Sequence, residues 1–133
     1  MEFVDEDEEP NPELNRITNA IIGAAIAVHS KLGPGYLESF YANALAIEFA
    51  KRDIAFEKEH RFEVLYDGQV IGVGSVDFLV EGKVIVELKA VDTLSPLFTA
   101  QVISYLKANN IKLGILLNFN CKVLKDGIRR IAK

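Results

Sequence analysis

Several features typical of secreted and membrane proteins are scarce in this sequence. It has one cysteine, Cys121, so no disulfide can form within the chain, which fits a reducing compartment. The longest apolar run, Ala20 to Val28, is about half as long as a membrane helix requires. The first residues lack both the basic region and the apolar stretch of a signal peptide. We therefore expect a cytoplasmic protein that makes no contact with a membrane.

Basic residues are missing from the first 13 positions, whereas acids are concentrated there. Residues 14–133 hold 12 acids and 15 bases, and from Lys107 onward seven bases face one acid, Asp126. This asymmetry indicates a polyanionic partner, while the simpler interpretation is a solubilising tail. We predict a disordered acidic tail over residues 1–10. The seven acids of the first 13 residues are Glu2, Asp5, Glu6, Asp7, Glu8, Glu9 and Glu13.

The length and patterning predict a single mixed α/β domain over residues 11–133. A chain of 133 residues suits one domain, and half of it is apolar, which is enough for a core. Asn11-Pro12 is typical of a helix start, and Gly33-Pro34-Gly35 ends that helix. The following order is helix, three strands, helix and two strands. The segments are a helix over 36–52, strands over 55–66, 69–80 and 84–89, a helix over 93–109, a strand over 111–118, and a last hairpin over 122–131 that contains Asp126-Gly127.

An acid and a base share one face of the most apolar strand. Side chains alternate along a strand, so Glu87 and Lys89 point the same way as Ile85. Charges within an apolar strand are costly unless they are paired or bind a metal. One interpretation is an ordinary ion pair on an edge strand, and the other is a functional site.

A second acid favours the functional interpretation. Asp77 lies within the apolar strand before Glu81-Gly82-Lys83. If those three residues form the turn, Val80 pairs with Val84, and Asp77 then lies opposite Glu87. A two-residue turn would place Asp77 opposite Val86 instead and would separate the carboxylates.

Two carboxylates and a lysine at one point suit phosphoryl transfer. Mg²⁺ prefers carboxylate oxygens and keeps several waters. The metal lowers the pKa of a bound water, and an adjacent amine can position that water or neutralise developing charge. The expected cofactor is therefore Mg²⁺, or Mn²⁺ in its place.

The chain resembles the PD-(D/E)XK nuclease superfamily. Asp77 followed by Glu87-Leu88-Lys89 is similar to its D…E-x-K signature, and Gly35, Glu38 and Tyr41 resemble the signature of its GxxExxY branch. The resemblance covers residues 14–131. Further similar blocks are Val84 to Val91, Ala100 to Lys107 and Leu116 to Phe119.

The resemblance implies a restriction-endonuclease-like core of αβββαβ order, with a mixed central sheet flanked by helices. It implies that Asp77, Glu87 and Glu38 are catalytic metal ligands, and that Lys89 is the catalytic lysine. It also implies a group that supports the site or touches substrate: Gln101, Tyr105 and Tyr41. The simpler interpretation of the two tyrosines is that they are core aromatics, and Gln101 could instead cap a buried backbone group.

Two positions depart from the family pattern, because Ser75 stands where an arginine is common and Phe98 where a histidine is common. Three hypotheses follow. The chain is a Mg²⁺-dependent nuclease acting on DNA or RNA, or it is an inactive nuclease-fold module that binds nucleic acid or a protein. The third hypothesis is that the acidic tail covers a basic surface as a polyanion mimic. Since many small nucleases work in pairs, a homodimer is included among the expected partners.

Overall fold

The helices and strands of the computed structural model follow the predicted order over the residues that it describes, 11–133. The predicted disordered tail, 1–10, lies outside them. Within residues 11–133, no helix combines the length and the apolar character needed to cross a membrane. The elements are helix α1 (Pro12–Leu32), helix α2 (Glu38–Lys51), strands β1 (Phe56–Tyr66), β2 (Gln69–Val80) and β3 (Val84–Lys89), helix α3 (Pro96–Asn109), strand β4 (Leu113–Asn118), the 3₁₀ helix η1 (Leu124–Gly127) and strand β5 (Ile128–Ala132).

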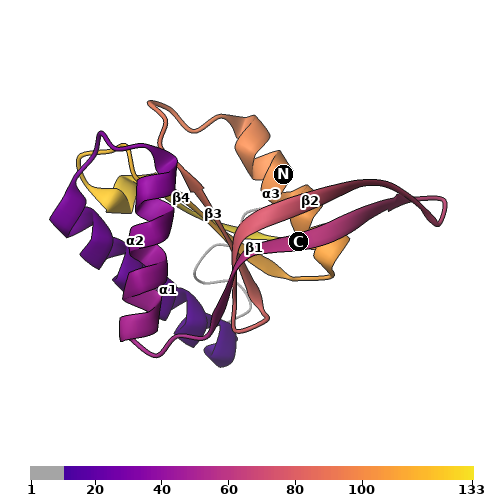
Figure 1. Ribbon diagram of the computed structural model, residues 1–133, viewed down its shortest axis with the longest axis horizontal. Coiled ribbons are helices and arrows are strands. Elements are labelled where there is room, and N and C mark those ends of the chain that lie inside the picture. The colour runs from indigo at the N-terminus through magenta and orange to yellow at the C-terminus, as the bar shows by residue number, and fades with distance from the viewer. Residues whose placement is uncertain (1–10) are drawn as a thin grey trace.

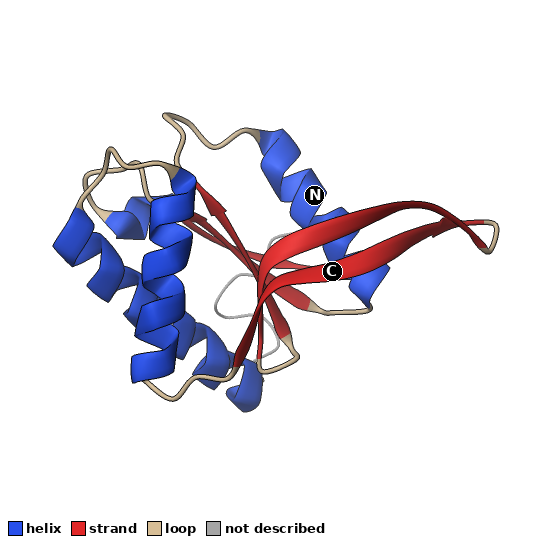
Figure 2. Cartoon of the chain, in the orientation of Figure 1, coloured by secondary structure: helices blue, strands red, loops and turns tan. Residues whose placement is uncertain are grey.

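The sheet has five strands in the order β1-β2-β3-β4-β5. Strands β3 and β4 are parallel, and α3 supplies the crossover between them, as a parallel pair requires. The other neighbours are antiparallel. Helices lie on both sides of this mixed sheet (Figures 1 and 2). The predicted fold class is therefore confirmed.

Two hydrophobic cores occupy the two faces of the sheet. Helices α1 and α2 cover one face, where Ile21 and Phe49 pack with Val86 of β3. Helix α3 covers the other face, where Val102 and Leu106 pack with Ile85 of the same strand. Alternation along β3 therefore points Glu87 and Lys89 toward the α3 side.

The β1–β2 ribbon changes face at Asp77. Phe78 belongs to the core beneath α1 and α2, whereas Val76 belongs to the core beneath α3, although regular alternation would put both on one face. On β1, Glu59 has a φ of 56° and interrupts the ladder between Lys58 and His60. An irregularity of this kind redirects a strand. Beyond it the ribbon extends away from the rest of the sheet (Figure 1).

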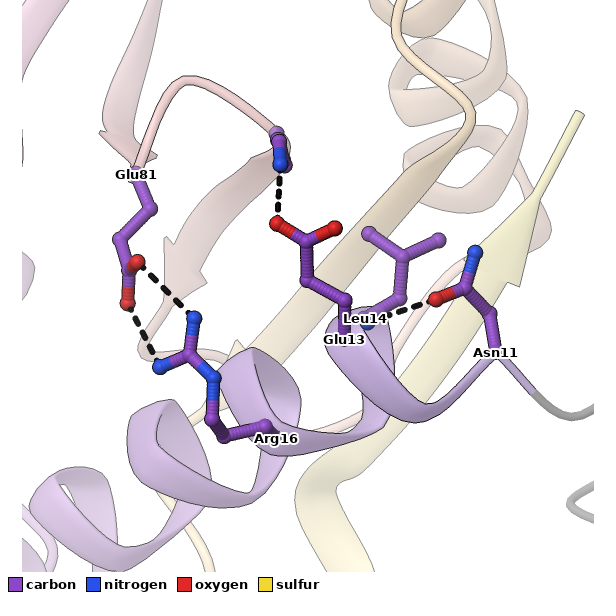
Figure 3. Close-up of polar contacts among 6 residues, drawn as sticks. Asn11, Glu13, Leu14, Arg16 and Glu81 are labelled. Atoms are coloured by element: carbon purple, nitrogen blue, oxygen red, sulfur yellow. Dashed lines mark hydrogen bonds and ion pairs between the residues drawn. The ribbon is translucent and has the colours of Figure 1, made fainter.

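The turn between β2 and β3 has the predicted three residues. Val80 pairs with Val84, and Glu81 and Gly82 both adopt positive φ. The first turn of α1 is tied to this connection, because Arg16 makes two hydrogen bonds to Glu81, at 3.1 and 3.3 Å (Figure 3). Glu13 also pairs with Lys83. Helix α1 thus contacts the turn that sets the register of the candidate site.

Three predicted boundaries need correction. Helix α3 begins at Pro96 rather than at residue 93, because Ser95 is its N-cap and accepts from the Leu97 N–H. Helix α2 begins at Glu38 rather than Tyr36, because Gly35 has a φ of 111° and Leu37 at the N-cap is extended. Asp126-Gly127 does not form a hairpin turn but lies in η1, which precedes β5. A side chain at Gly127 would meet the Asn118 carbonyl oxygen 2.3 Å away, so close packing explains this glycine.

Gly74→Ala is expected to destabilise the fold by about 1–3 kcal/mol, as overpacking of a filled site does. The added Cβ would lie 2.6 Å from Cζ of Phe62, whose ring is buried against Tyr105. Gly72→Ala is the matched control, since nothing lies within 4 Å of its Cβ position. Urea unfolding compares the two variants, and equal stabilities would contradict this packing assignment.

Candidate functional site

Asp77 and Glu87 meet where the ladder between β2 and β3 ends. The last ladder pair is Phe78 with Val86, so the register continues to Asp77 opposite Glu87. Beyond the Phe78–Val86 pair, backbone N–H groups of the two strands donate to the carboxylates of Asp77 and Glu87. The Asp77 N–H donates to Glu87 Oε1 at 3.2 Å, and the Leu88 N–H donates to Asp77 Oδ2 at 2.7 Å. These bonds hold the two carboxylates side by side.

Burial and the neighbouring acid both oppose ionisation of Glu87. Its side chain lies in the sheet with only 7% of the residue exposed. Burial, followed by the charge of Asp77, raises the pKa of Glu87 from 4.5 to about 8, against the opposing effects of the Asp77 N–H and the Lys89 charge. The positive charge of Lys89 thus does not offset the combined effect of burial and Asp77 on Glu87.

Lys89 lies two residues after Glu87 on the same face of β3. Its Nζ is 4.5 Å from the centroid of the Phe98 ring, at the start of α3. The amine therefore has an aromatic neighbour at the position where the resemblance implies a histidine. The Lys89 carbonyl accepts a 2.9 Å hydrogen bond from the Phe119 N–H, which fixes the backbone at the end of the strand.

Helix α3 places two further predicted residues beside the acids. The pKa of Tyr105 is raised by burial and then by the charges of Glu87 and Asp77, while a hydrogen bond with Gln101 lowers it. Gln101 is exposed, and Tyr105 is partly buried against Phe62. The two residues are four apart and share a face of α3, and Tyr105 is near enough to the acids for their charges to affect its pKa.

Helix α2 contributes Glu38 from its first turn. Burial, followed by the charge of Asp77, raises the pKa of Glu38, and the charge of Lys89 lowers it. The N-termini of α2 and α3 lie at the same end of the molecule as the C-terminal ends of β3 and β4 (Figure 1). Glu38 is therefore near the acid pair, although it does not join it in a compact cluster.

Tyr41 of α2 is fully buried, and its hydroxyl fixes the turn before the helix. It donates to the Gly33 carbonyl at 2.5 Å and accepts from the Tyr36 N–H at 3.2 Å. Its ring stacks on Phe119 with 4.6 Å between centroids. This geometry gives Tyr41 a supporting position beneath the segment that carries Glu38.

The donor set fits a hard divalent cation held by two carboxylates. Within residues 11–133, no three His, Cys, Asp or Glu side chains converge closely enough to hold a metal unaided. Mg²⁺ is usually bound through one or two carboxylates, with waters and substrate phosphates completing its shell. Among the described residues, the second oxygen of Asp77 and of Glu87 receives no N–H donor. These oxygens are the available ligands.

Asn118 is a site residue to which the sequence assigned no role. It ends β4 beside Lys89, and it is buried. Its amide donates to the Val91 carbonyl at 2.8 Å, and its Oδ1 accepts from the Val91 N–H at 3.0 Å and the Asn120 N–H at 3.2 Å. In the sequence, the feature that could have indicated this role is a polar residue at the end of the otherwise apolar strand β4. The residue ties down the loop after Lys89.

The basic C-terminal stretch does not form one surface. Lys112 and Lys133 are joined by a backbone hydrogen bond before β4, at the end of that strand remote from the acids. Arg130 on β5 donates to Asn15 of α1 at 2.8 Å. Lys122 and Lys125 instead line a pocket beside the turn between α1 and α2. Strand pairing therefore separates these basic residues in the fold.

Comparison with known proteins found a match to a family and a similarity to a solved structure. A sequence model of the PD-(D/E)XK nuclease superfamily matches residues 15–131. Among solved structures, the chain is similar to the one described as "Crystal structure of SSO0001", with a TM-score of 0.44 and 17% identity over 86% of this chain. The similarity spans 63% of the length of that chain. No curated protein matches the sequence.

Without divalent cations, the protein is expected to lose stability as the pH rises from 4.5 toward about 8. The folded chain binds the Glu87 proton more tightly than the unfolded chain does, so deprotonation in this range opposes folding. Glu87→Gln is expected to remove this part of the pH dependence. Thermal unfolding in EDTA measures it, with Glu63→Gln on the exposed side of β1 as control. Parallel profiles for the wild type and Glu87→Gln would contradict the assignment.

Asn118→Ala is expected to destabilise the protein by about 1–3 kcal/mol, because it leaves partly buried backbone groups of Val91 and Asn120 without their hydrogen-bond partner. Asn43→Ala is the control, since Asn43 is exposed and its side chain accepts a hydrogen bond from the exposed Lys58. Hydrogen exchange should rise at Val91 and Asn120 in the Asn118 variant. Unchanged exchange at both amides would show that the loop is held by other contacts.

Proposed function

The chain belongs to the PD-(D/E)XK nuclease superfamily, and from this premise we propose that it is a metal-dependent nuclease that hydrolyses phosphodiester bonds in DNA or RNA. The observation that carries the proposal is the contact between Asp77 and Glu87, with Lys89 on the same face of β3. The mixed sheet flanked by helices is consistent with the restriction-endonuclease-like fold.

Asp77 and Glu87 are the proposed ligands of a Mg²⁺ or Mn²⁺ ion. Each carboxylate accepts a hydrogen bond from the other acid's strand, and a cation would offset the burial and the Asp77 charge that raise the pKa of Glu87. Glu38 is the proposed third acid, because the charge of Asp77 contributes, after burial, to its raised pKa. When bound, the ion would lower the pKa of a water and stabilise charge on the phosphate.

Lys89 is proposed to orient the attacking water and to neutralise charge that develops on the phosphate. Its amine shares a strand face with Glu87, and its contact with the Phe98 ring restricts the long side chain. Asn118 supports this position by holding the loop that follows Lys89. The lysine is thereby kept on the acid side of the sheet.

Gln101, Tyr105 and Tyr41 are proposed as supporting residues with different tasks. Gln101 is exposed on α3 and can reach substrate, whereas Tyr105 packs between Phe62 and the acids. Tyr41 is buried in the core, and its hydroxyl fixes the turn that precedes Glu38. We further propose membership of the GxxExxY branch. Gly35 supplies a positive φ before α2, Glu38 is the first residue of that helix, and the Tyr41 hydroxyl binds the backbone of the turn.

One observation favours a second candidate function, an inactive nuclease-fold module that binds nucleic acid or protein. Phe98 covers one side of the Lys89 amine with an apolar ring, where a polar side chain could have assisted proton transfer. In that case binding would not require a metal, and no turnover would accompany it.

Purified protein is expected to cleave DNA or RNA oligonucleotides in Mg²⁺ or Mn²⁺ and to lose cleavage in EDTA. Glu87→Ala and Lys89→Ala should each lower the rate by about 100-fold or more, as removal of a transition-state contact does. Gel analysis of single-stranded and duplex substrates measures this rate. Glu63→Gln, at an exposed position on the β1–β2 ribbon, is the matched control.

Binding of Mn²⁺, measured by calorimetry, supplies a readout besides activity. The wild type and Lys89→Ala should bind the ion, and Glu87→Ala should not. Cleavage that survives both substitutions would refute the assigned roles. Absence of cleavage together with retained nucleic-acid binding would support the second candidate.

A further inference from the structure

The amine of Lys89 lies near the two acids but forms an ion pair with neither of them. Lys89 shares a face of β3 with Glu87, and its charge acts on Glu87 against the burial and the Asp77 charge that raise the pKa of that acid. Within residues 11–133, however, no carboxylate oxygen lies within 4.0 Å of the Lys89 Nζ. The amine instead lies over the ring of Phe98, with 4.5 Å between Nζ and the ring centroid.

The Lys89 side chain is long enough to reach the carboxylate of Glu87. Residues two apart on a strand are separated by about 7 Å, and a lysine carries its amine on a flexible stem of four carbons. An ammonium placed between Asp77 and Glu87 would take up the carboxylate oxygens that a divalent cation needs as ligands. The contact with Phe98 therefore leaves those oxygens accessible.

Phe98 is held firmly at the position where the amine meets it. It lies in the first turn of α3, where the Ser95 side chain accepts from the Leu97 N–H at 3.1 Å and the Ser95 carbonyl accepts from the Phe98 N–H at 3.0 Å. The Phe98 ring is partly buried and packs against the core beneath α3. The face of an aromatic ring attracts a cation but carries no net charge, so the ring can hold the amine without neutralising it.

We propose that Phe98 holds the Lys89 amine away from Asp77 and Glu87, and so keeps the two carboxylates open for a divalent cation. Phe98 is then a positioning residue, because it acts through Lys89. This inference rests on the proposed function, since it concerns the metal ligands assigned there. An ammonium that occupied the acids would have to leave before the ion could bind. The apparent affinity for the ion is therefore reduced in proportion to the fraction of molecules in which the acids are free.

Loss of the Phe98 ring is expected to weaken cation binding only when the Lys89 amine is present. In Phe98→Ala the apparent Mn²⁺ affinity should fall about tenfold, as expected if the amine occupies the acids in about nine of ten molecules. In a Lys89→Met background, which keeps an unbranched stem without the charge, Phe98→Ala should change the affinity by less than about twofold. Calorimetry of the wild type, the two single variants and the double variant measures this cycle.

Three further variants test whether the aromatic face is what matters. Phe98→Tyr should retain the Mn²⁺ affinity because it keeps that face, whereas Phe98→Leu should weaken binding although it keeps apolar bulk. Leu97→Ala is the matched control, since Leu97 lies in the same turn of α3 and is 76% exposed. Melting temperatures verify that each variant is folded.

NMR of the metal-free protein measures the position of the amine directly. An aromatic ring shifts the resonances of protons above its face upfield, so the Cε protons of Lys89 should show an upfield shift that Phe98→Leu removes. Diamagnetic Mg²⁺ should leave this shift in place in the wild type, because the amine does not occupy the acids beforehand.

The outcomes separate this inference from the nuclease proposal. An equal effect of Phe98→Ala with and without the Lys89 amine would overturn the inference, because the ring would then act through packing alone. Lys89 protons without an upfield shift would overturn it as well. Either result leaves the proposed metal ligands intact when the wild type binds Mn²⁺, whereas a wild type that binds no Mn²⁺ contradicts the ligands and the inference together. Binding that follows the expected cycle supports the inference even if no cleavage is found.

Discussion

The arrangement of this molecule depends on two hydrogen bonds that cross from β2 to β3 where their ladder stops. The Asp77 amide binds the Glu87 carboxylate, and the Leu88 amide binds the Asp77 carboxylate. Each side chain thus takes the place of a backbone acceptor and holds the other acid in contact. Burial and the charge of Asp77 oppose ionisation of Glu87 in this position, and a bound cation would favour ionisation of both acids.

The elements around the two acids fix the position of strands β2 and β3. Helix α1 contacts the turn that sets the register, through Arg16 and Glu81 (Figure 3). The irregularity at Glu59 lets the β1–β2 ribbon leave the sheet where Asp77 must face α3. The positive φ of Glu59 is an unfavourable backbone conformation for a residue other than glycine, and such conformations occur frequently at functional sites.

The candidate site is charged and largely buried at the same time. The acids and Lys89 lie on the α3 face of the sheet, and the Phe98 ring of α3 lies against the Lys89 amine. Glu87 is 7% exposed. Interactions between charges are stronger in less polar surroundings, so burial strengthens the interactions among these groups.

The sequence by itself determined the order of the elements, the cap at Asn11 and the pairing of Val80 with Val84, since each follows from residues close together in the chain. It also selected Asp77, Glu87 and Lys89, because alternation and a three-residue turn suffice to bring them together. Only the tertiary structure decided the role of Asn118, the separation of the basic C-terminal residues and the contact of Lys89 with Phe98. These features depend on which distant elements pack together. The periodicity of a segment predicts its secondary structure and its buried face, but not the segment that packs against it.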